Sequence, residues 1–447
     1  MPFISTRHPH GTPVTLAEAV QRGLAPDGGL YVPVDIPRMT ADEFAALRGR
    51  SLPEVATALL APLVADTFAA TRLGELMAAA LDFDIPLVSI APGLSMLELF
   101  HGPTLAFKDV GARTMARWLA AVSGSVDRRP LTVLVATSGD TGGAVAHAFH
   151  GVAGTRVGVL YPRGRVSDVQ EAQFATLGGN VTAVAVEGAF DDCQRLVKEA
   201  FADAAIAGAL RLTSANSINI GRLLPQMAYY AWAALQLPAG SPPLTVVVPS
   251  GNLGNLCAGV MAQRRGVPIG RFVVATTTAN DPLPRYLTSG GYEPRASTPT
   301  LASAMDVGAP SNFERLLHFF DHDEHAMRAT MTGVTVSDDD IRAAIRALAD
   351  QHGYVADPHS AVGYLGARAV AHGAGGAPVV VLATAHPAKF REVVEPALGR
   401  DVPLPAALAE RLALPRLSIA AAPALPALSA VLATLDGPHA PGKISAP

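Results

Sequence analysis

The feature that most constrains the fold of this chain is a repeated order of short apolar runs, glycine-rich turns and helical stretches. The run LTVLVA at 131–136 stops at TSGDTGG, and AVAHAFHG then has the composition of a helix. Further apolar runs of this kind occur within 155–162, 180–188, 244–266, 271–277 and 377–387. Strands that are apolar at nearly every position and alternate with helices are typical of a parallel sheet covered on both faces. The sequence therefore predicts an α/β fold with mostly parallel sheets.

The strands fall into two sets, roughly at 87–186 and 244–382, which predict two lobes with a cleft between them. We expect an N-terminal extension at 1–85, α/β lobes at 86–243 and 244–400, and a C-terminal segment at 401–447. Open α/β sheets bind ligands at the carboxyl ends of their strands, so the cleft is the candidate site. No unit repeats at the periods typical of solenoids and propellers, which argues against those architectures.

Charge and cysteine content exclude several classes of protein. The chain has 34 Lys and Arg against 38 Asp and Glu, and 49% of its 447 residues are hydrophobic. This is the reverse of the composition of disordered chains, and it offers no basic surface for a nucleic acid. Two cysteines, Cys193 and Cys257, cannot form a disulfide framework and have no neighbouring ligand pairs for zinc. We expect buried thiols in a reducing compartment and no metal site.

The two ends of the chain bear on its location. The N-terminal residues lack the cationic segment and apolar run of a secretory signal, so we expect a cytoplasmic protein. The uncharged stretch 417–435 is long enough for a membrane helix. It is rich in alanine and interrupted by Pro423 and Pro426, however, so we expect it to pack on the globular part rather than to enter a membrane.

Lysine is rare in this chain, which limits the candidates for amine chemistry. Only four of the 34 cationic side chains are lysines, at Lys108, Lys198, Lys389 and Lys443. Lys108 follows Phe107, and an amine among apolar neighbours has a lowered pKa and can attack a carbonyl. Lys198 is expected on a solvated helix and Lys443 lies in the tail. Lys389 is a weaker candidate, equally compatible with a surface ion pair, and an ordinary solvated lysine is also the alternative for Lys108.

Two glycine-rich turns each follow a strand and precede a helix. In PSGNLGNLCAG at 249–259, Gly251 and Gly254 let backbone N–H groups converge at the helix start, which suits a phosphate. A plain tight turn explains that spacing equally well, since it matches neither of the two standard nucleotide motifs. In TSGDTGGA at 137–144, Ser138 and Thr141 suit a carboxylate or phosphate. Asp140 is unfavourable beside an anion, and helix capping is the alternative there.

Several phrases together carry a resemblance to a known family. They are APDGGLYVP, ELFHGPTLAFKD, ATSGDTGGAVAHAF, YPRGRVSDVQEAQFATLGGN, SANSINIGRLLPQ, VPSGNLGNLCAG, AMDVGAPSNFER and TAHPAKF. In this order, from about residue 23 to beyond residue 390, they resemble the threonine synthases, pyridoxal-phosphate enzymes of the tryptophan-synthase-β-like fold (fold type II). The resemblance implies pyridoxal 5′-phosphate as cofactor, with Lys108 forming the Schiff base.

The resemblance also implies where the cofactor and the substrate bind. The cofactor phosphate is expected on Ser250, Gly251, Asn252, Leu253, Gly254 and Asn255, with Thr384 facing the pyridine nitrogen. For the substrate carboxylate we expect Ser138, Gly139, Asp140 (through its N–H) and Thr141. For the substrate phosphate we expect Asn216, Ser217 and Arg222, with Arg163 or Arg165 as alternatives. Many relatives in the wider fold carry Asn in the loop that here contains Asp140, so the partner of the cofactor 3′ oxygen stays unassigned.

The reaction of this family converts O-phospho-L-homoserine and water into L-threonine and phosphate, which makes the chain a lyase of threonine biosynthesis. Another pyridoxal-phosphate lyase, such as a threonine dehydratase or a phospholyase, would share the same lysine and glycine loop. A non-catalytic ligand-binding relative is the alternative from a different class, and the presence of Lys108 argues against it. We expect a monomer or homodimer without nucleic-acid or membrane partners.

Overall fold

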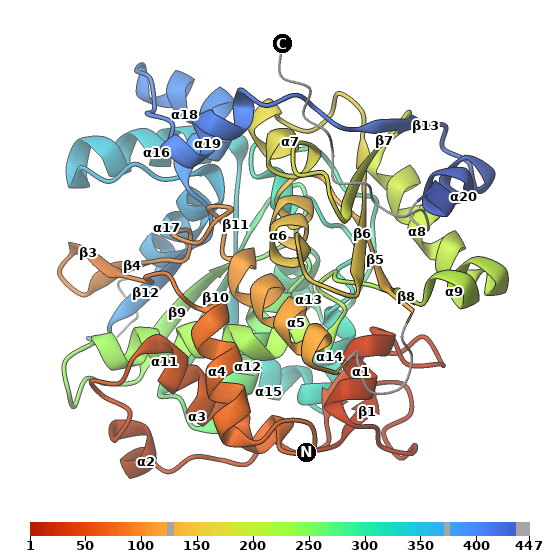
Figure 1. The fold of residues 1–447 in the computed structure, drawn as a ribbon. Coiled ribbons are helices and arrows are strands. Elements are labelled where there is room, and N and C mark those ends of the chain that lie inside the picture. The colour runs from red at the N-terminus through yellow and green to blue at the C-terminus, as the bar shows by residue number, and fades with distance from the viewer. Residues whose placement is uncertain (123–128, 371–375, 435–447) are drawn as a thin grey trace.

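The computed structural model describes residues 1–122, 129–370 and 376–434 and contains two mostly parallel sheets (Figure 1). The larger sheet has six strands in the order β11 (Met331–Val336), β10 (Ile269–Thr277), β9 (Leu244–Pro249), β12 (Val379–Ala383), β4 (Leu94–Glu98) and β3 (Leu87–Ala91). The smaller has five in the order β13 (Ile419–Ala421), β7 (Val181–Val186), β6 (Thr155–Pro162), β5 (Leu131–Ala136) and β8 (Leu212–Thr213). Every pairing in the two sheets is parallel except that of β3 with β4. The predicted α/β fold is confirmed.

A third, two-stranded antiparallel sheet of β1 (Phe3–Ser5) and β2 (Tyr31–Pro33) lies in the N-terminal part. The helices before the first lobe are α1 (Leu16–Arg22), α2 (Ala41–Ala45), α3 (Leu52–Val64) and α4 (Ala70–Ala80). Those from residue 108 to 236 are α5 (Lys108–Val122), α6 (Asp140–Phe149), α7 (Asp168–Ala175), α8 (Phe190–Ala202), α9 (Ala204–Leu210), α10 (Ile220–Leu223), the 3₁₀ turn η1 (Leu224–Gln226) and α11 (Met227–Gln236).

The remaining helices follow the strands of the larger sheet and form the C-terminal part. They are α12 (Gly254–Arg265), α13 (Pro282–Ser289), η2 (Ser303–Met305), α14 (Phe313–Phe319), α15 (Glu324–Thr330), α16 (Asp338–His352), α17 (Pro358–Val370), η4 (Pro387–Phe390), α18 (Arg391–Leu398), α19 (Ala406–Leu412) and α20 (Leu425–Thr434). Several start where the sequence places a cap. Ser337, for example, forms a capping box with Asp340 at the start of α16.

The burial of the strands explains their apolar composition. All residues of β5, β9 and β12 are buried, because helices cover both faces of each sheet. On the smaller sheet α6 packs against β6 and contacts the neighbouring helices α5 and α7, and α8 packs against β5 and β6 (Figure 1). On the larger sheet α17 packs across β9, β10 and β12, while α13 packs against β10 and β11.

The sheets draw strands from segments that are distant in the sequence. β3 and β4 precede the Lys108 region but belong to the larger sheet, where β4 pairs with β12. β13, from the C-terminal segment, pairs with β7 of the smaller sheet. The segment predicted as one lobe, 86–243, therefore contributes β3 and β4 to the larger sheet, and the C-terminal segment 401–447 contributes β13 to the smaller one. The division into domains stays a prediction.

The alanine-rich C-terminal stretch packs on the globular part, beside the smaller sheet, as expected. Its residues form β13 and α20, and Leu428 and Leu432 are buried against α8. Within 1–122, 129–370 and 376–434, no helix has both the length and the apolar character needed to cross a membrane. Residues 435–447, which include Lys443, lie outside the described part of the chain.

Candidate active site

Lys108 is the first residue of α5, and its position is set by the end of β12. The N–H of Phe107 donates to the carbonyl of Thr384 at 2.9 Å, and the N–H of His386 donates to the carbonyl of Leu105 at 3.1 Å. The segment before Lys108 thus adds a short bridge beyond the carboxyl end of an inner strand of the larger sheet. Thr384, predicted to face the pyridine nitrogen, lies beside this bridge and is 6% exposed.

The amine of Lys108 is largely withdrawn from solvent. Its side chain is 14% exposed, and Nζ lies 5.2 Å from the centre of the Phe107 ring. Burial lowers the pKa of this amine, and the positive charges of Lys389 and Arg222 lower it further, whereas Asp140 opposes them. A lowered pKa leaves more of the neutral amine, which is the form that attacks a carbonyl.

Asp140, the first residue of α6, is the carboxylate at the centre of the site. Its Oδ2 lies 3.3 Å from Lys108 Nζ, and its Oδ1 lies 2.8 Å from Lys389 Nζ and accepts from Gln170 Nε2 at 3.0 Å. Burial alone would raise the pKa of this carboxyl, but the charges of Lys389 and Lys108 outweigh burial and hold the pKa below its ordinary value. Asp140 is therefore an ionised counter-ion, and its carboxylate does not cap α6.

The side chain of Thr137 stabilises the turn around Asp140 through two hydrogen bonds. Its Oγ1 accepts from the N–H of Gly139 at 2.9 Å and from that of Gly142 at 2.8 Å. Gly139 has φ of +143°, and a Cβ there would lie 2.4 Å from the Gln170 side chain, so only glycine fits. Ser138 is exposed, and the N-cap residue of α6, Gly139, has no side chain that could cap the helix. These features suit a carboxylate placed at the start of α6.

The second glycine turn, at 250–255, forms the N-terminus of α12. Leu253 adopts a left-handed conformation with φ of +60°, and the first turn of the helix has no side-chain cap. A Cβ on Gly251 would lie 3.0 Å from the carbonyl oxygen of Ala304. Nδ2 of Asn255 is buried and has no hydrogen-bond partner among the described residues, while its Oδ1 lies 2.6 Å from the Tyr229 hydroxyl. Ser250 is buried and donates its hydroxyl to Val248.

The segment at 216–222 connects this turn to the start of α5. Ser217 Oγ accepts from Asn252 Nδ2 at 2.6 Å, and a Cβ on Gly254 would lie 3.3 Å from Ser217 Cβ. A Cβ on Gly111, in the first turn of α5, would lie 3.1 Å from Nε of Arg222. The structure therefore places the 216–222 segment between the two elements that were predicted to hold the cofactor.

Arg222 is a buried guanidinium with a hydrogen-bond donor that the described residues leave unused. It is 3% exposed, and its Nη1 donates to the carbonyl of Ala215, but its Nε has no partner among the described residues. Burial lowers the pKa of its guanidinium to about 10. The Oδ1 of Asn216 is also buried without a partner in the described chain. The alternatives differ: Arg163 is exposed and pairs with Glu187 at 3.0 Å, and Arg165 is exposed.

These residues fit pyridoxal 5′-phosphate. The cofactor needs a poised primary amine, which Lys108 offers, and a nest of N–H groups for its phosphate, which the uncapped start of α12 offers. The unpartnered Nδ2 of Asn255 is a further donor at that end. Glycine at 251 keeps the cradle open, because a side chain there would meet the 302–306 turn.

The sequence interpretation of Lys389 as a possible surface lysine is wrong. Lys389 is fully buried and ion-pairs with Asp140. Gln170 and Gln173, both on α7, were missed altogether: the first donates to Asp140 and the second to the carbonyl of Thr104. The signal in the sequence was the i, i+3 spacing of two amides within an otherwise apolar helix face. Lys198 is exposed, and Cys193 and Cys257 are buried and free, as predicted.

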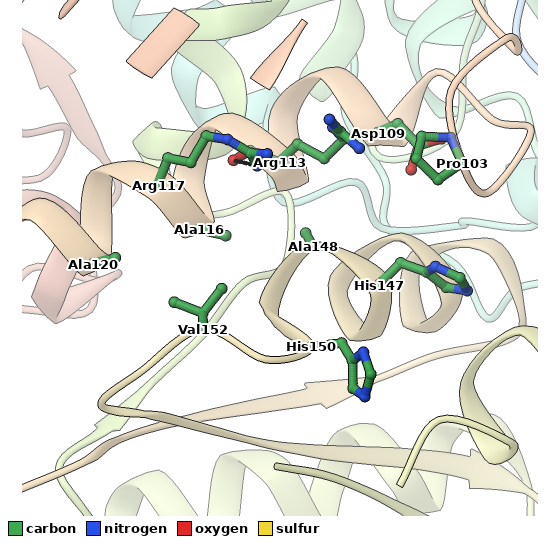
Figure 2. Close-up of a pocket in the computed structure, with 10 residues that line it drawn as sticks. All are labelled: Pro103, Asp109, Arg113, Ala116, Arg117, Ala120, His147, Ala148, His150 and Val152. Carbon is green, nitrogen blue, oxygen red and sulfur yellow. Dashed lines mark hydrogen bonds between the residues drawn. The ribbon is translucent and has the colours of Figure 1, made fainter. Parts of the chain in front are cut away.

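A separate cavity of about 420 Å³ lies between α5 and α6 (Figure 2). Arg113 and Arg117 line it from α5, and His147 and His150 line it from the opposite side. No residue predicted for the cofactor or the substrate is among its lining residues. It is therefore distinct from the site built around Lys108.

Comparisons with known proteins decide the family. A model of "Pyridoxal-phosphate dependent enzyme" matches residues 93–385, "Threonine synthase N terminus" matches 2–81, and "Threonine synthase, C-terminal" matches 360–430. The threonine synthase of Serratia marcescens is 45% identical over 411 residues, which cover 92% of this chain and 94% of the relative. The chain belongs to the threonine synthase family. It is a pyridoxal-phosphate-dependent lyase, as the sequence predicted.

Solved structures of the family agree with this assignment. The crystal structure of threonine synthase from Escherichia coli is 41% identical, with a TM-score of 0.90 over 97% of this chain and 100% of that one. The cofactor-bound threonine synthase from Brucella melitensis is 38% identical, with a TM-score of 0.92 over 98% of this chain and 100% of that one. A threonine deaminase from Solanum lycopersicum, at 16% identity and a TM-score of 0.55, shares only the fold. The close likeness is thus to synthases, not to the dehydratases weighed as an alternative.

Proposed function

We propose that Lys108 carries the cofactor and moves the protons of the threonine synthase reaction on O-phospho-L-homoserine. The observation that carries this assignment is the buried amine of Lys108, which lies 3.3 Å from Asp140 and has a pKa lowered by burial. The 250–255 turn would hold the cofactor phosphate and Thr384 would face the pyridine nitrogen. The cofactor, when bound, supplies the electron sink next to the substrate α-carbon that no side chain can provide.

The substrate has two anionic ends, and the chain offers a cationic or N–H group for each. The start of α6 at 138–141 would bind the carboxylate, supported by exposed Ser138 and by an N-cap residue, Gly139, that has no side chain to occupy the helix N-terminus. Arg222, with Asn216 and Ser217, would bind the substrate phosphate, supported by the buried Nε of Arg222 that lacks a protein partner in the described chain. Its charge lies close enough to lower the pKa of Lys108, which supports a place beside the reacting atoms.

The amine of Lys108 would then take the α proton and transfer protons at the β and γ carbons. Phosphate leaves from the γ carbon and water adds at the β carbon, so that phosphohomoserine and water give threonine and phosphate. A hydroxyl at Thr384, unlike a carboxylate, would not keep the pyridine nitrogen protonated, which favours elimination and replacement over transamination.

We also retain two predictions about the setting of the enzyme. A cytoplasmic location is supported by Cys193 and Cys257, which are buried and form no disulfide within the described chain. A monomer or homodimer is the expected state, and size-exclusion chromatography with light scattering measures it directly.

Product analysis with phosphohomoserine tests the function. The holoenzyme is expected to release threonine and inorganic phosphate in equal amounts. A 2-oxo acid with ammonia in place of threonine would support the lyase alternative and overturn the assignment.

A further inference from the structure

Lys389 is a buried cation that the proposed mechanism does not use. Its side chain is fully buried in η4, and its Nζ lies 2.8 Å from Oδ1 of Asp140 and donates to the carbonyl oxygen of Thr104 at 2.7 Å. Burying an ammonium costs free energy unless a partner compensates for the lost water. In a chain that uses arginine for nearly all of its cationic side chains, a lysine at such a position calls for a specific explanation.

The partners of Lys389 are themselves held in place. The N–H and Oγ1 of Thr104 donate to the carboxylate of Asp109 at 2.8 and 2.7 Å, which anchors the turn before α5. Gln173 donates to the same Thr104 carbonyl at 2.9 Å, from α7. The ammonium of Lys389 is therefore bound at a defined point between α5, α6 and α7.

Asp140 is shared unequally between the two lysines. Its Oδ1 receives Lys389 at 2.8 Å and Gln170 at 3.0 Å, whereas Oδ2 receives Lys108 at the longer distance of 3.3 Å. One carboxylate thus faces two ammonium groups, and the guanidinium of Arg222 adds a third positive charge near Lys108. Of the two ammonium groups, Lys389 lies nearer to the carboxylate of Asp140. The negative charge of Asp140 therefore only partly offsets the positive charge of a protonated Lys108.

We propose that Lys389 is a positioning residue that holds Asp140 as a shared counter-ion and keeps the amine of Lys108 ready to lose its proton. This inference rests on the proposed role of Lys108. Asp140 then has two roles. Its carboxylate orients the Lys108 amine through Oδ2, while Lys389 limits how strongly that carboxylate can stabilise the protonated form of Lys108.

Other charged groups face this cluster and must stay unchanged in a test. Those that act on Lys108 are Asp140 on α6, Lys389 on η4 and Arg222 on α10. Those that interact with Lys389 or Asp140 are Asp109, His147, His359 and His386. Substituting Lys389 alone changes one charge among them.

The test measures how fast Lys108 reacts with a small amine-reactive aldehyde in the full-length chain from which the cofactor has been removed. Formaldehyde with cyanoborohydride is applied briefly at a series of pH values, and methylation of the Lys108 peptide is measured by mass spectrometry. In Lys389→Met, Asp140 pairs with Lys108 alone, the pKa of Lys108 rises, and its labelling rate below that pKa is expected to fall about tenfold. Lys198→Met, at an exposed helix position, is the matched control and is expected to leave the rate unchanged.

Asp140→Asn provides the opposite test. It removes the carboxylate but keeps both lysines, so Lys108 is expected to label faster than in the wild type.

An unchanged Lys108 profile in folded Lys389→Met, with only a lower melting temperature, would show a purely structural tether and overturn the proposal. If Lys389→Met does not fold, Asp140→Asn decides, because equal or slower labelling of Lys108 there contradicts a shared counter-ion. Borohydride trapping of the cofactor on wild-type Lys108 is measured separately, so a failure of this inference is distinct from a failure of the proposed function.

Discussion

The backbone N–H of Phe107 donates to the carbonyl of Thr384 at 2.9 Å, although 277 positions separate the two residues in the sequence. This bond joins the residue before Lys108 to the residue after β12, an inner strand of the larger sheet. The backbone that carries the Lys108 amine is thus tied to the larger sheet rather than to a loop. Placement on a rigid element is what a catalytic group needs to keep its geometry.

Gly254→Val is expected to weaken cofactor binding at least tenfold while the far-UV spectrum stays near that of the wild type. A Cβ at this position would lie 3.3 Å from Ser217 Cβ and 3.4 Å from Asn312 Nδ2, and the extra methyl groups would obstruct the phosphate cradle. Equilibrium titration with pyridoxal 5′-phosphate measures the effect. Gly208→Val is the control, because nothing lies within 4 Å of a Cβ there. Full cofactor occupancy in Gly254→Val would mean that the loop is an ordinary turn.

Arg222→Ala is expected to lower kcat/KM for phosphohomoserine by roughly ten- to a hundredfold, because a charge-assisted contact to phosphate contributes about 1.5 to 3 kcal/mol. The cofactor spectrum should stay intact. The affinities for phosphohomoserine and for threonine are measured side by side, with Arg163→Ala as a control for an exposed arginine. Equal losses for both ligands would contradict a phosphate-binding role and favour a tether between α5 and α10.

Arg315→Met is expected to lower the free energy of unfolding by about 2 to 4 kcal/mol, because buried carbonyl groups lose a charged donor. The Arg315 guanidinium is fully buried and donates to the carbonyls of Tyr31, Ser217 and Ile218. Urea unfolding measures the change. Arg328→Met, which removes a partly exposed ion pair with Glu324, should cost less than about 1 kcal/mol. Similar midpoints for the two variants would show that Arg315 is not a structural junction.

The local parts of the fold were predictable from the sequence. The run at 131–136 and the strand and helix around the 250–255 turn lie where the apolar pattern indicates. Which strands share a sheet was not predictable. β4 pairs with β12, nearly 300 residues later, and the sequence of neither strand specifies the other as its neighbour.

The candidate site was predictable where a motif carries the chemistry by itself. Lys108 and the glycine turns are of this kind. Lys389 is not, because its burial depends on Asp140 and Thr104, which come from distant segments of the chain. Burial and charge pairing of this kind are tertiary properties, and an isolated HPAKF segment has the composition of a solvated turn.

Borohydride reduction of the holoenzyme tests the central assignment most directly. The reduced protein is digested, and the peptide that carries the cofactor is identified by mass spectrometry. The cofactor label is expected on Lys108 alone. Lys108→Arg keeps the positive charge, but a guanidinium stays protonated and forms no such linkage, so this variant should show no label and no absorbance of an imine between cofactor and protein. A label on Lys389 in the wild type, or a retained reducible linkage in Lys108→Arg, would contradict the account.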